Sequence, residues 1–127
     1  MSRIDEGIRY TESHEWVKKD GENYIMGITD HAQHEMGEIV MVELPAQGAQ
    51  AVRGEALGAI EAVKTAEDFY APLDGKVVKV NSELDGNPAL VNEDPYGKGW
   101  LLVIKAVDPA QYDELLSPDQ YRALAGE

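Results

Sequence analysis

The sequence predicts a mainly β protein, a sandwich or barrel of short strands with short helices at the C-terminus. Glycines and prolines, 12 and 6 of the 127 residues, divide the chain into pieces of which few show a helical period. The apolar residues instead form short runs rich in β-branched side chains and separated by turns, as in all-β proteins. Only the last twenty residues place apolar side chains at helical spacing.

The length predicts a single domain covering residues 1–127. A domain ordinarily has roughly 100–200 residues, and no segment is rich enough in Gly, Ser or Pro to be a linker. Hydrophobic residues make up 43% of the chain and charged residues 28%, which is a globular composition.

In the N-terminal half, the sequence predicts a strand over Tyr24–Thr29 after a turn-prone segment. Asp30 is a candidate N-cap for a short helix that runs to about His34, and Gly37 closes it. These residues therefore predict a strand followed directly by a short helix.

The next predicted strands contain most of the β-branched and small residues. Glu38–Leu44 is a run rich in apolar and β-branched residues. It predicts a strand that is buried on both faces and stopped by Pro45. Glu55–Val63 alternates small and larger side chains, as expected for a tightly packed sandwich strand. Three further strands complete the set: Phe69–Ala71, Lys76–Val80 and Leu101–Val107.

Two short C-terminal helices are predicted within residues of about 109–125. Pro109 suits a first helical position after Asp108, and Ser117 with Pro118 restarts a helix as cap and first turn. We expect these helices to cover an edge or an open end of the sheet.

The charge of the chain limits its partners. Its 24 Asp and Glu residues against 11 Lys and Arg residues give a formal net charge of −13. Such a chain repels polyanions, so we expect no nucleic acid and no membrane among its partners, and self-repulsion favours a monomer. The N-terminal residues lack the apolar region of a signal peptide and the character of a transit peptide. The expected compartment is the bacterial cytoplasm, or the mitochondrial matrix only if the chain is a trimmed mature form.

The chain has no cysteine. This excludes disulfides, thiolate metal sites, iron–sulfur clusters and a cysteine nucleophile. Any redox chemistry must therefore be carried by a group added after translation.

Lys64 lies at a predicted chain reversal. The stop at Ala71-Pro72-x-x-Gly75 defines a return strand, so residues 64–67 are expected to form the turn. A lysine in a turn is ordinarily a solvated surface residue, and here acidic neighbours surround it. A functional role requires a frame of residues that presents this side chain on a rigid tip.

That frame is present. Gly54-Glu55, the segment Ile60–Lys64 and the segment Tyr70-Ala71-Pro72-x-x-Gly75-x-Val77 together resemble the attachment motif of lipoyl and biotinyl domains. Biotinyl domains usually place the lysine between two methionines, and the neighbours here are Val63 and Thr65, which favours lipoyl. The resemblance implies a lipoyl/biotinyl-type barrel-sandwich hybrid, with the lipoyl hairpin at about 54–80.

Further segments are similar, in order and spacing, to the glycine cleavage system H-protein family. They extend from about residue 8 to the C-terminal helices: Tyr10-Thr11-x-x-His14-Glu15-Trp16, Gly27-Ile28-Thr29-x-x-Ala32, Gly37–Val40, Val42–Pro45, Val80-Asn81, Pro88-x-Leu90-Val91-Asn92 and Pro95-Tyr96-Gly97-x-Gly99-Trp100. Two departures, Ala62 where the family commonly has Ser and Met36 where it has Leu, replace no group that carries chemistry.

The resemblance implies a carrier protein without catalytic chemistry of its own. Lipoic acid would be attached covalently, by an amide, to Lys64 by lipoate-attaching enzymes. The implied partners are the pyridoxal-phosphate-dependent glycine decarboxylase (P protein), the folate-dependent aminomethyltransferase (T protein) and dihydrolipoamide dehydrogenase (L protein). The aminomethyl group of glycine would travel from the first to the second, and the third would reoxidise the carrier. Ser13, Glu15 and Asp68 are the implied contacts of the aminomethyl-bearing arm.

Several alternatives remain open from the residues. The chain could relay lipoyl or octanoyl groups to other lipoylated enzymes, or carry biotin. An enzyme would need His14 and Glu15 as an acid–base pair, without any nucleophile motif or phosphate loop. His14 could equally pack around Trp16 or contact the arm. His31 and His34 are spaced for a metal, but no third ligand accompanies them, so no metal is expected.

Overall fold

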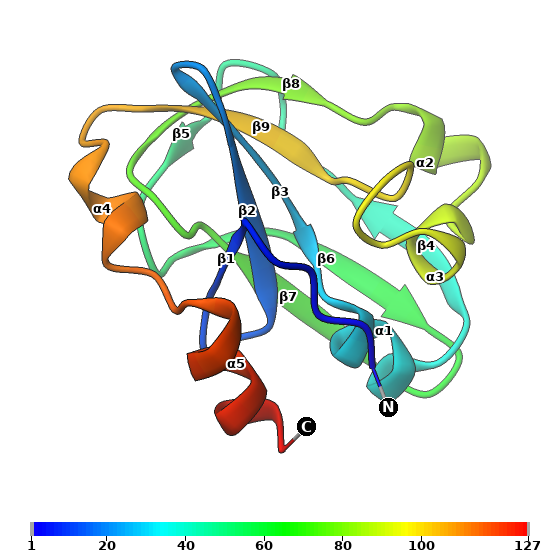
Figure 1. Cartoon of the computed structure of the whole chain (residues 1–127). Coiled ribbons are helices and arrows are strands. Elements are labelled where there is room, and N and C mark those ends of the chain that lie inside the picture. The colour runs from blue at the N-terminus through cyan, green and yellow to red at the C-terminus, as the bar shows by residue number, and fades with distance from the viewer. Residues whose placement is uncertain (1, 127) are drawn as a thin grey trace.

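The computed structural model describes residues 2–126 and contains two antiparallel sheets and several short helices (Figure 1). The larger sheet has the strand order β1 (Arg9–Tyr10), β2 (Glu15–Asp20), β3 (Asn23–Ile28), β9 (Leu102–Ala106), β8 (Gly75–Val80) and β5 (Gln50–Ala51). The smaller sheet has the order β4 (Ile39–Glu43), β6 (Ala56–Ala62) and β7 (Ala66–Tyr70). The helices are α1 (Asp30–Met36), α2 (Glu83–Gly86), α3 (Leu90–Glu93), α4 (Ala110–Asp113) and α5 (Pro118–Ala125). The predicted mainly β fold with C-terminal helices is confirmed.

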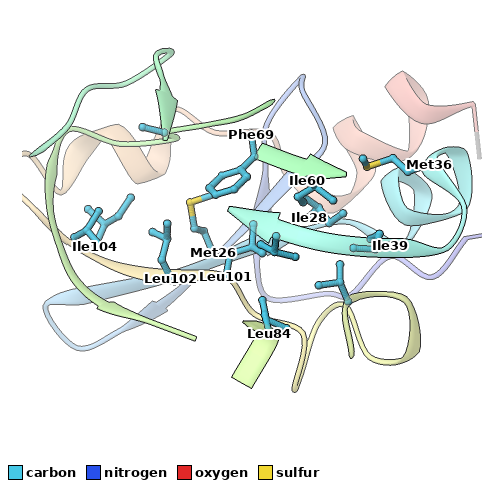
Figure 2. Close-up of a cluster of buried hydrophobic side chains, with 14 of the residues drawn as sticks. Met26, Ile28, Met36, Ile39, Ile60, Phe69, Leu84, Leu101, Leu102 and Ile104 are labelled. Atoms are coloured by element: carbon cyan, nitrogen blue, oxygen red, sulfur yellow. The ribbon is translucent and has the colours of Figure 1, made fainter. Parts of the chain in front are cut away.

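The main core lies between the two sheets. Figure 2 shows Met26 of β3 and Leu102 of β9 on one side, and Ile60 of β6 and Phe69 of β7 on the other. Each of these four side chains is at most 1% exposed. Fully burying a side chain of this size stabilises the fold by about 1.5–3 kcal/mol. The inner faces of the two sheets therefore hold each other in place, as in other β-sandwiches.

The strand predicted at Glu38–Leu44 exists as β4, but the prediction that both of its faces are buried is wrong. Val40 and Met41 are 47% and 46% exposed. β4 is an edge strand of the smaller sheet, and its register with β6 shifts between Ile39 and Met41. The outer face of this sheet lies toward solvent, and the irregularity turns two successive apolar side chains outward.

α1 follows β3 as predicted, but its N-cap is Thr29 rather than Asp30. The Thr29 hydroxyl accepts a hydrogen bond from the backbone N–H of Ala32 at 3.1 Å. Asp30 occupies the first turn, where its carboxylate accepts from the Gln33 side-chain amide at 2.7 Å. The helix ends at Gly37, which has a φ of 82°. That left-handed conformation is one that glycine adopts without steric cost.

The C-terminal helix α5 lies against the β1 edge of the larger sheet, whereas α4 places Tyr112 against Tyr24 of β3, with ring centroids 5.2 Å apart. α5 begins with a capping box, in which the Ser117 hydroxyl accepts from the Gln120 backbone N–H and the Gln120 side chain accepts from the Ser117 N–H. Tyr121 of α5 stacks on Tyr10 of β1 with ring centroids 4.5 Å apart. Within residues 2–126, no helix is long and apolar enough to cross a membrane.

Candidate functional site

The reversal that carries Lys64 is a tight hairpin turn between β6 and β7. Glu61 pairs with Ala66, and the Ala62 N–H donates to the Thr65 carbonyl at 2.8 Å. Only Val63 and Lys64 lie between that last pair, and both are exposed. The predicted reversal at residues 64–67 was placed too late, because the Ala71-Pro72-x-x-Gly75 stop that located the return strand lies beyond the far end of β7.

The tip of this hairpin rests on the C-terminal end of α1, and Figure 1 shows the turn beside that helix. The Val63 N–H donates to the Glu38 carbonyl at 2.9 Å. The Lys64 stem crosses Gly37 so closely that a Cβ there would lie 3.1 Å from Lys64 Cε and 3.2 Å from Cδ. A residue without a side chain is therefore what lets the lysine lie along the end of the helix.

Asn92 of α3 fixes the segment under the tip. Its side-chain amide donates to the Gly37 carbonyl and to Gln33 Oε1, both at 2.9 Å, and its oxygen accepts from the Ile39 N–H at 2.9 Å. One side chain thus bonds to the helix, to the glycine and to the first residue of β4. These bonds make the end of α1 a fixed support for the hairpin tip.

A cleft of about 570 Å³ opens beside the tip, between the loop leading into β2, α1 and β7. Its lining includes Ser13, Glu15 and Asp68, the three residues implied as arm contacts. It also includes Met36, the neighbour of the glycine that the Lys64 stem crosses. The structure therefore brings the three residues together in one cleft that reaches Met36, next to the glycine on which the Lys64 side chain lies, although Ser13 and Asp68 are far apart in sequence.

Glu15 forms the floor of this cleft. It is 1% exposed, and its carboxylate accepts hydrogen bonds from the Thr11 hydroxyl, from the Ser13 hydroxyl at 2.6 Å and from the Tyr70 N–H at 3.1 Å. Burial raises the pKa of Glu15, and these hydrogen bonds oppose the rise. The floor is thus a carboxyl group held by neutral donors, and a cation in the cleft would stabilise its charged form.

Asp68 occupies the rim. It lies on β7 and is exposed, and two other exposed carboxylates, Glu35 and Glu67, also line the cleft. The cleft therefore combines a buried acidic floor with a solvent-exposed acidic rim.

His14 is part of the cleft wall and adopts a left-handed conformation with a φ of 69°. Its Nδ1 lies 2.6 Å from the Tyr121 hydroxyl, and its ring stacks on His31 with centroids 4.8 Å apart. Burial, followed by the charge of His31, lowers the pKa of His14. The structure places the His14 ring in the wall of the cleft, next to Tyr121 and His31. His14 and Glu15 are hydrogen-bonded to different partners, the first to Tyr121 and the second to Thr11, Ser13 and Tyr70.

The two other histidines interact with their own helix. His31 Nε2 lies 3.6 Å from Glu35, and His34 Nε2 lies 3.8 Å from Asp30. Within the part of the chain that the structure describes, no three His, Asp or Glu side chains are grouped to hold a metal ion.

Sequence reasoning did not identify the supporting roles of Thr11, Asn92 and Tyr121. Thr11 and Asn92 lie inside the quoted motifs, so a signal was present but had no stated role. Tyr121 carried only the signal of helical spacing, which predicts packing.

Comparisons with known proteins give one consistent result. The sequence family described as Glycine cleavage H-protein matches residues 8–127. A glycine cleavage system H protein of Carboxydothermus hydrogenoformans is 49% identical over 127 residues, covering 100% of this chain and 98% of the relative. One from Halalkalibacterium halodurans is 48% identical, covering 100% and 99%. The crystal structure of a glycine cleavage system H protein from Mycobacterium marinum matches with a TM-score of 0.90 and 34% identity, covering 98% of this chain and 100% of that one.

Proposed function

The chain belongs to the glycine cleavage H-protein family, and from that membership we propose that it is the lipoyl carrier of the glycine cleavage system. When attached, lipoic acid supplies the disulfide on which the aminomethyl group of glycine travels from the glycine decarboxylase to the aminomethyltransferase. Dihydrolipoamide dehydrogenase then restores the disulfide. The observation that carries the proposal is an exposed lysine on a two-residue turn beside an acidic cleft.

Lys64 is the proposed attachment site. An attaching enzyme must reach its amine, and the exposed turn of Val63 and Lys64 allows this. The support under the tip, from Gly37 and Asn92, holds the start of the arm at a defined place. A defined starting point maintains a high effective concentration of the arm's end near the cleft or near a docked active site.

Ser13, Glu15 and Asp68 are the proposed contacts of the loaded arm. The loaded group carries a primary amine, which is cationic near neutral pH. Glu15 offers a buried carboxyl whose ionised form a cation stabilises, and Asp68 offers an exposed carboxylate at the rim. Ser13 donates to Glu15 at 2.6 Å and so keeps one of its oxygens in place.

The proposed partners are the P, T and L proteins and the lipoate-attaching enzymes, and the proposed state is a non-catalytic monomer in the cytoplasm. The net charge of −13 supports a monomer through self-repulsion. The relatives named above come from bacteria, which supports that compartment.

The test is the intact mass of protein purified from its native host under lipoate-replete conditions. We expect one lipoyl-sized addition that Lys64→Arg abolishes. Lys19→Arg is the matched control, because Lys19 is also an exposed lysine near a hairpin turn, and it should retain the addition. A biotin-sized addition, or none, would overturn the proposal.

A second measurement separates glycine cleavage from the relay of lipoyl or octanoyl groups. The lipoylated protein is mixed with a purified glycine decarboxylase, and the exchange of labelled bicarbonate into the glycine carboxyl group is measured. Exchange that depends on lipoylated Lys64 supports the glycine cleavage role. Full lipoylation without exchange would assign the chain to the relay.

A further inference from the structure

The larger sheet carries a second hollow, of about 680 Å³, on the face that points away from the smaller sheet. This outer groove is lined by side chains of β2, β3, β8 and β9 and of the segment Tyr96–Trp100. Ile25 and Val103 line it, whereas their chain neighbours Met26 and Leu102 point the other way, into the core between the sheets. The outer groove and the acidic cleft share no described lining residue, so they are separate sites.

One row of paired residues crosses the outer groove. Lys18 of β2 pairs with Ile25 of β3, Ile25 pairs with Val103 of β9, and Val103 pairs with Lys79 of β8. Residues that pair directly present their side chains on the same face of a sheet, and all four line the groove. Neighbouring strands lie about 4.8 Å apart, so the two lysine backbones are about 14 Å apart. The row therefore places two apolar side chains between two cations.

The cations on this face have no acidic partners in the fold. In the next row, Lys105 and Lys76 lie directly opposite each other, and like charges in that position destabilise a sheet. Within residues 2–126, neither these two lysines nor those of the first row form an ion pair. The chain nevertheless has 24 Asp and Glu residues, of which only Asp20 is among the described residues that line the groove. The outer groove is thus a cationic region of an anionic protein.

Aromatic side chains close one end of the outer groove. Trp16 is 2% exposed, and its Nε1–H donates to the Pro95 carbonyl at 2.9 Å, which ties the Tyr96–Trp100 segment to β2. Lys79 Nζ lies 5.5 Å from the centre of the Trp100 ring, a contact that favours a cation at this place. The wall and one of the two cations are therefore held in position before anything binds, which lowers the cost of binding.

We propose that the outer groove docks an acidic, extended segment of a partner protein, in which two carboxylates flank an apolar side chain. An extended chain rises about 3.3 Å per residue, so carboxylates four positions apart span about 13 Å, close to the separation of Lys18 and Lys79. The residue midway between them projects from the same side of the segment. It would lie over Ile25 and Val103, with one carboxylate at each lysine.

Charge favours a short acidic segment over a long polyanion. The net charge of −13 repels a nucleic acid, whose phosphates extend beyond the outer groove. A short segment meets only the local cations, and complementary charge of this kind increases association rates and specificity. A partner docked here leaves Lys64 uncovered, because the β6–β7 turn belongs to the smaller sheet, on the other side of the larger one. The proposal does not depend on the carrier function.

The test uses unmodified full-length protein and a blocked peptide of sequence Glu-Gly-Leu-Gly-Glu, followed by ¹H–¹⁵N NMR at low salt. We expect the peptide to shift the amide signals of Lys18, Ile25 and Val103 and not those of the acidic cleft. The matched peptide Gln-Gly-Leu-Gly-Gln should bind more weakly, and the difference should shrink as added salt screens the charges. Equal binding of the two peptides, or no shift at about 10 mM peptide, would overturn the proposal.

Two adjacent lysines provide the matched variants. Lys18→Glu replaces one attraction by a repulsion and should weaken binding of the acidic peptide about 2- to 30-fold, the range for one exposed ion pair lost and one repulsion gained. Lys19→Glu makes the same change in charge, but Lys19 pairs with the buried Tyr24 and does not line the outer groove, so its affinity should stay within about 2-fold of wild type. Both variants alter exposed residues, and unchanged signals outside β2 will show that they are folded.

The same spectra identify the other occupants. Equal affinities of Lys18→Glu and Lys19→Glu for the acidic peptide would overturn the proposal. Shifts at the outer groove that grow with protein concentration alone would assign it to a second copy of this chain. Tighter binding of an oligothymidylate than of the acidic peptide at these residues would assign it to nucleic acid. Either result would overturn docking of an acidic partner segment.

Discussion

Lys64 and Glu15 belong to one candidate site, but their side chains are held in opposite ways. Lys64 is exposed on a two-residue turn with its stem lying across a glycine, whereas Glu15 is 1% exposed and accepts three hydrogen bonds. An attachment lysine must be reachable by another enzyme. A carboxyl that binds a cation interacts more strongly when water is excluded and its geometry is set beforehand. Burial raises the pKa of Glu15, so a search for groups with a perturbed pKa would find the cleft.

Truncating each residue tests whether Glu15 contributes more to the stability of the fold than Lys64 does. Glu15→Ala leaves three donors without their acceptor, so the free energy of unfolding should fall by about 1–3 kcal/mol. Lys64→Ala removes an exposed side chain and should change it by less than about 0.5 kcal/mol. Urea unfolding of both variants at pH 7 measures this. Equal losses would show that the tip is as tightly integrated as the cleft.

Glu15→Ala also tests the proposed role of the cleft. Loss of the aminomethyl group from isolated loaded protein should be faster in this variant, because the buried carboxyl that faces the ammonium is gone. The control is Glu43→Ala, which removes an exposed carboxylate from β4, outside the cleft lining. If Glu15→Ala lost the group no faster than the wild type, Glu15 would not hold the arm.

The parts of the fold that could be predicted from the sequence are those with strong local signals. The apolar runs predicted β3 and β9, and the Ser117-Pro118 pair predicted the start of α5. β2 was not predicted because its residues do not alternate between apolar and polar. Its first three residues are all buried, and its last three, Lys18, Lys19 and Asp20, are all charged and exposed. β1 and β5 have two residues each and exist only through their partners, so no local pattern specifies them.

The residues of the candidate site also differ in whether a local sequence signal could locate them. Lys64 could be located from a motif, because a covalent attachment point depends on a short local frame. Ser13, Glu15 and Asp68 came only from a family resemblance, since nothing local indicates that the start of β2 and the middle of β7 line one cleft. Tyr121 acts across the fold through one hydroxyl. Roles of this kind depend on tertiary packing and leave no pattern in the sequence.

Gly37 allows a finer comparison, because it belongs to the tip through Lys64 and to the cleft through α1. It has a φ of 82°, and a Cβ there would press on the Lys64 stem. Gly21 has a φ of 63° and no atom within 4 Å of a built Cβ. Alanine should lower the free energy of unfolding at both positions, by about 1–2 kcal/mol at Gly21 and by about 1–3 kcal/mol at Gly37, whose φ of 82° and ψ of −156° are essentially restricted to glycine.

Only Gly37→Ala should also displace the lysine. We therefore expect slower lipoylation of Lys64 by a purified attaching enzyme in Gly37→Ala and an unchanged rate in Gly21→Ala. The rates are followed by intact mass against time. If both variants were modified at the wild-type rate, the contact between Gly37 and Lys64 would have no role in presenting the amine.

The smallest expected effect is a dependence of stability on pH that arises from Glu15 in the cleft. Burial raises the pKa of Glu15 above its ordinary value of 4.5, so just above pH 4.5 the folded state binds more protons at this group than the unfolded state. The contribution of Glu15 to the free energy of unfolding must then fall as pH rises through its unfolded pKa and up to its folded pKa.

Glu15→Gln removes this contribution and fits the site, because its amide N–H₂ can donate to the Ser13 hydroxyl while its oxygen accepts from the Tyr70 N–H. Between pH 4.5 and 7, the stability of the wild type relative to Glu15→Gln should therefore decline. Parallel curves for the wild type and Glu15→Gln would mean that burial does not disfavour the charged carboxylate, and that the cleft has no unfavourable charge for a cationic arm to relieve.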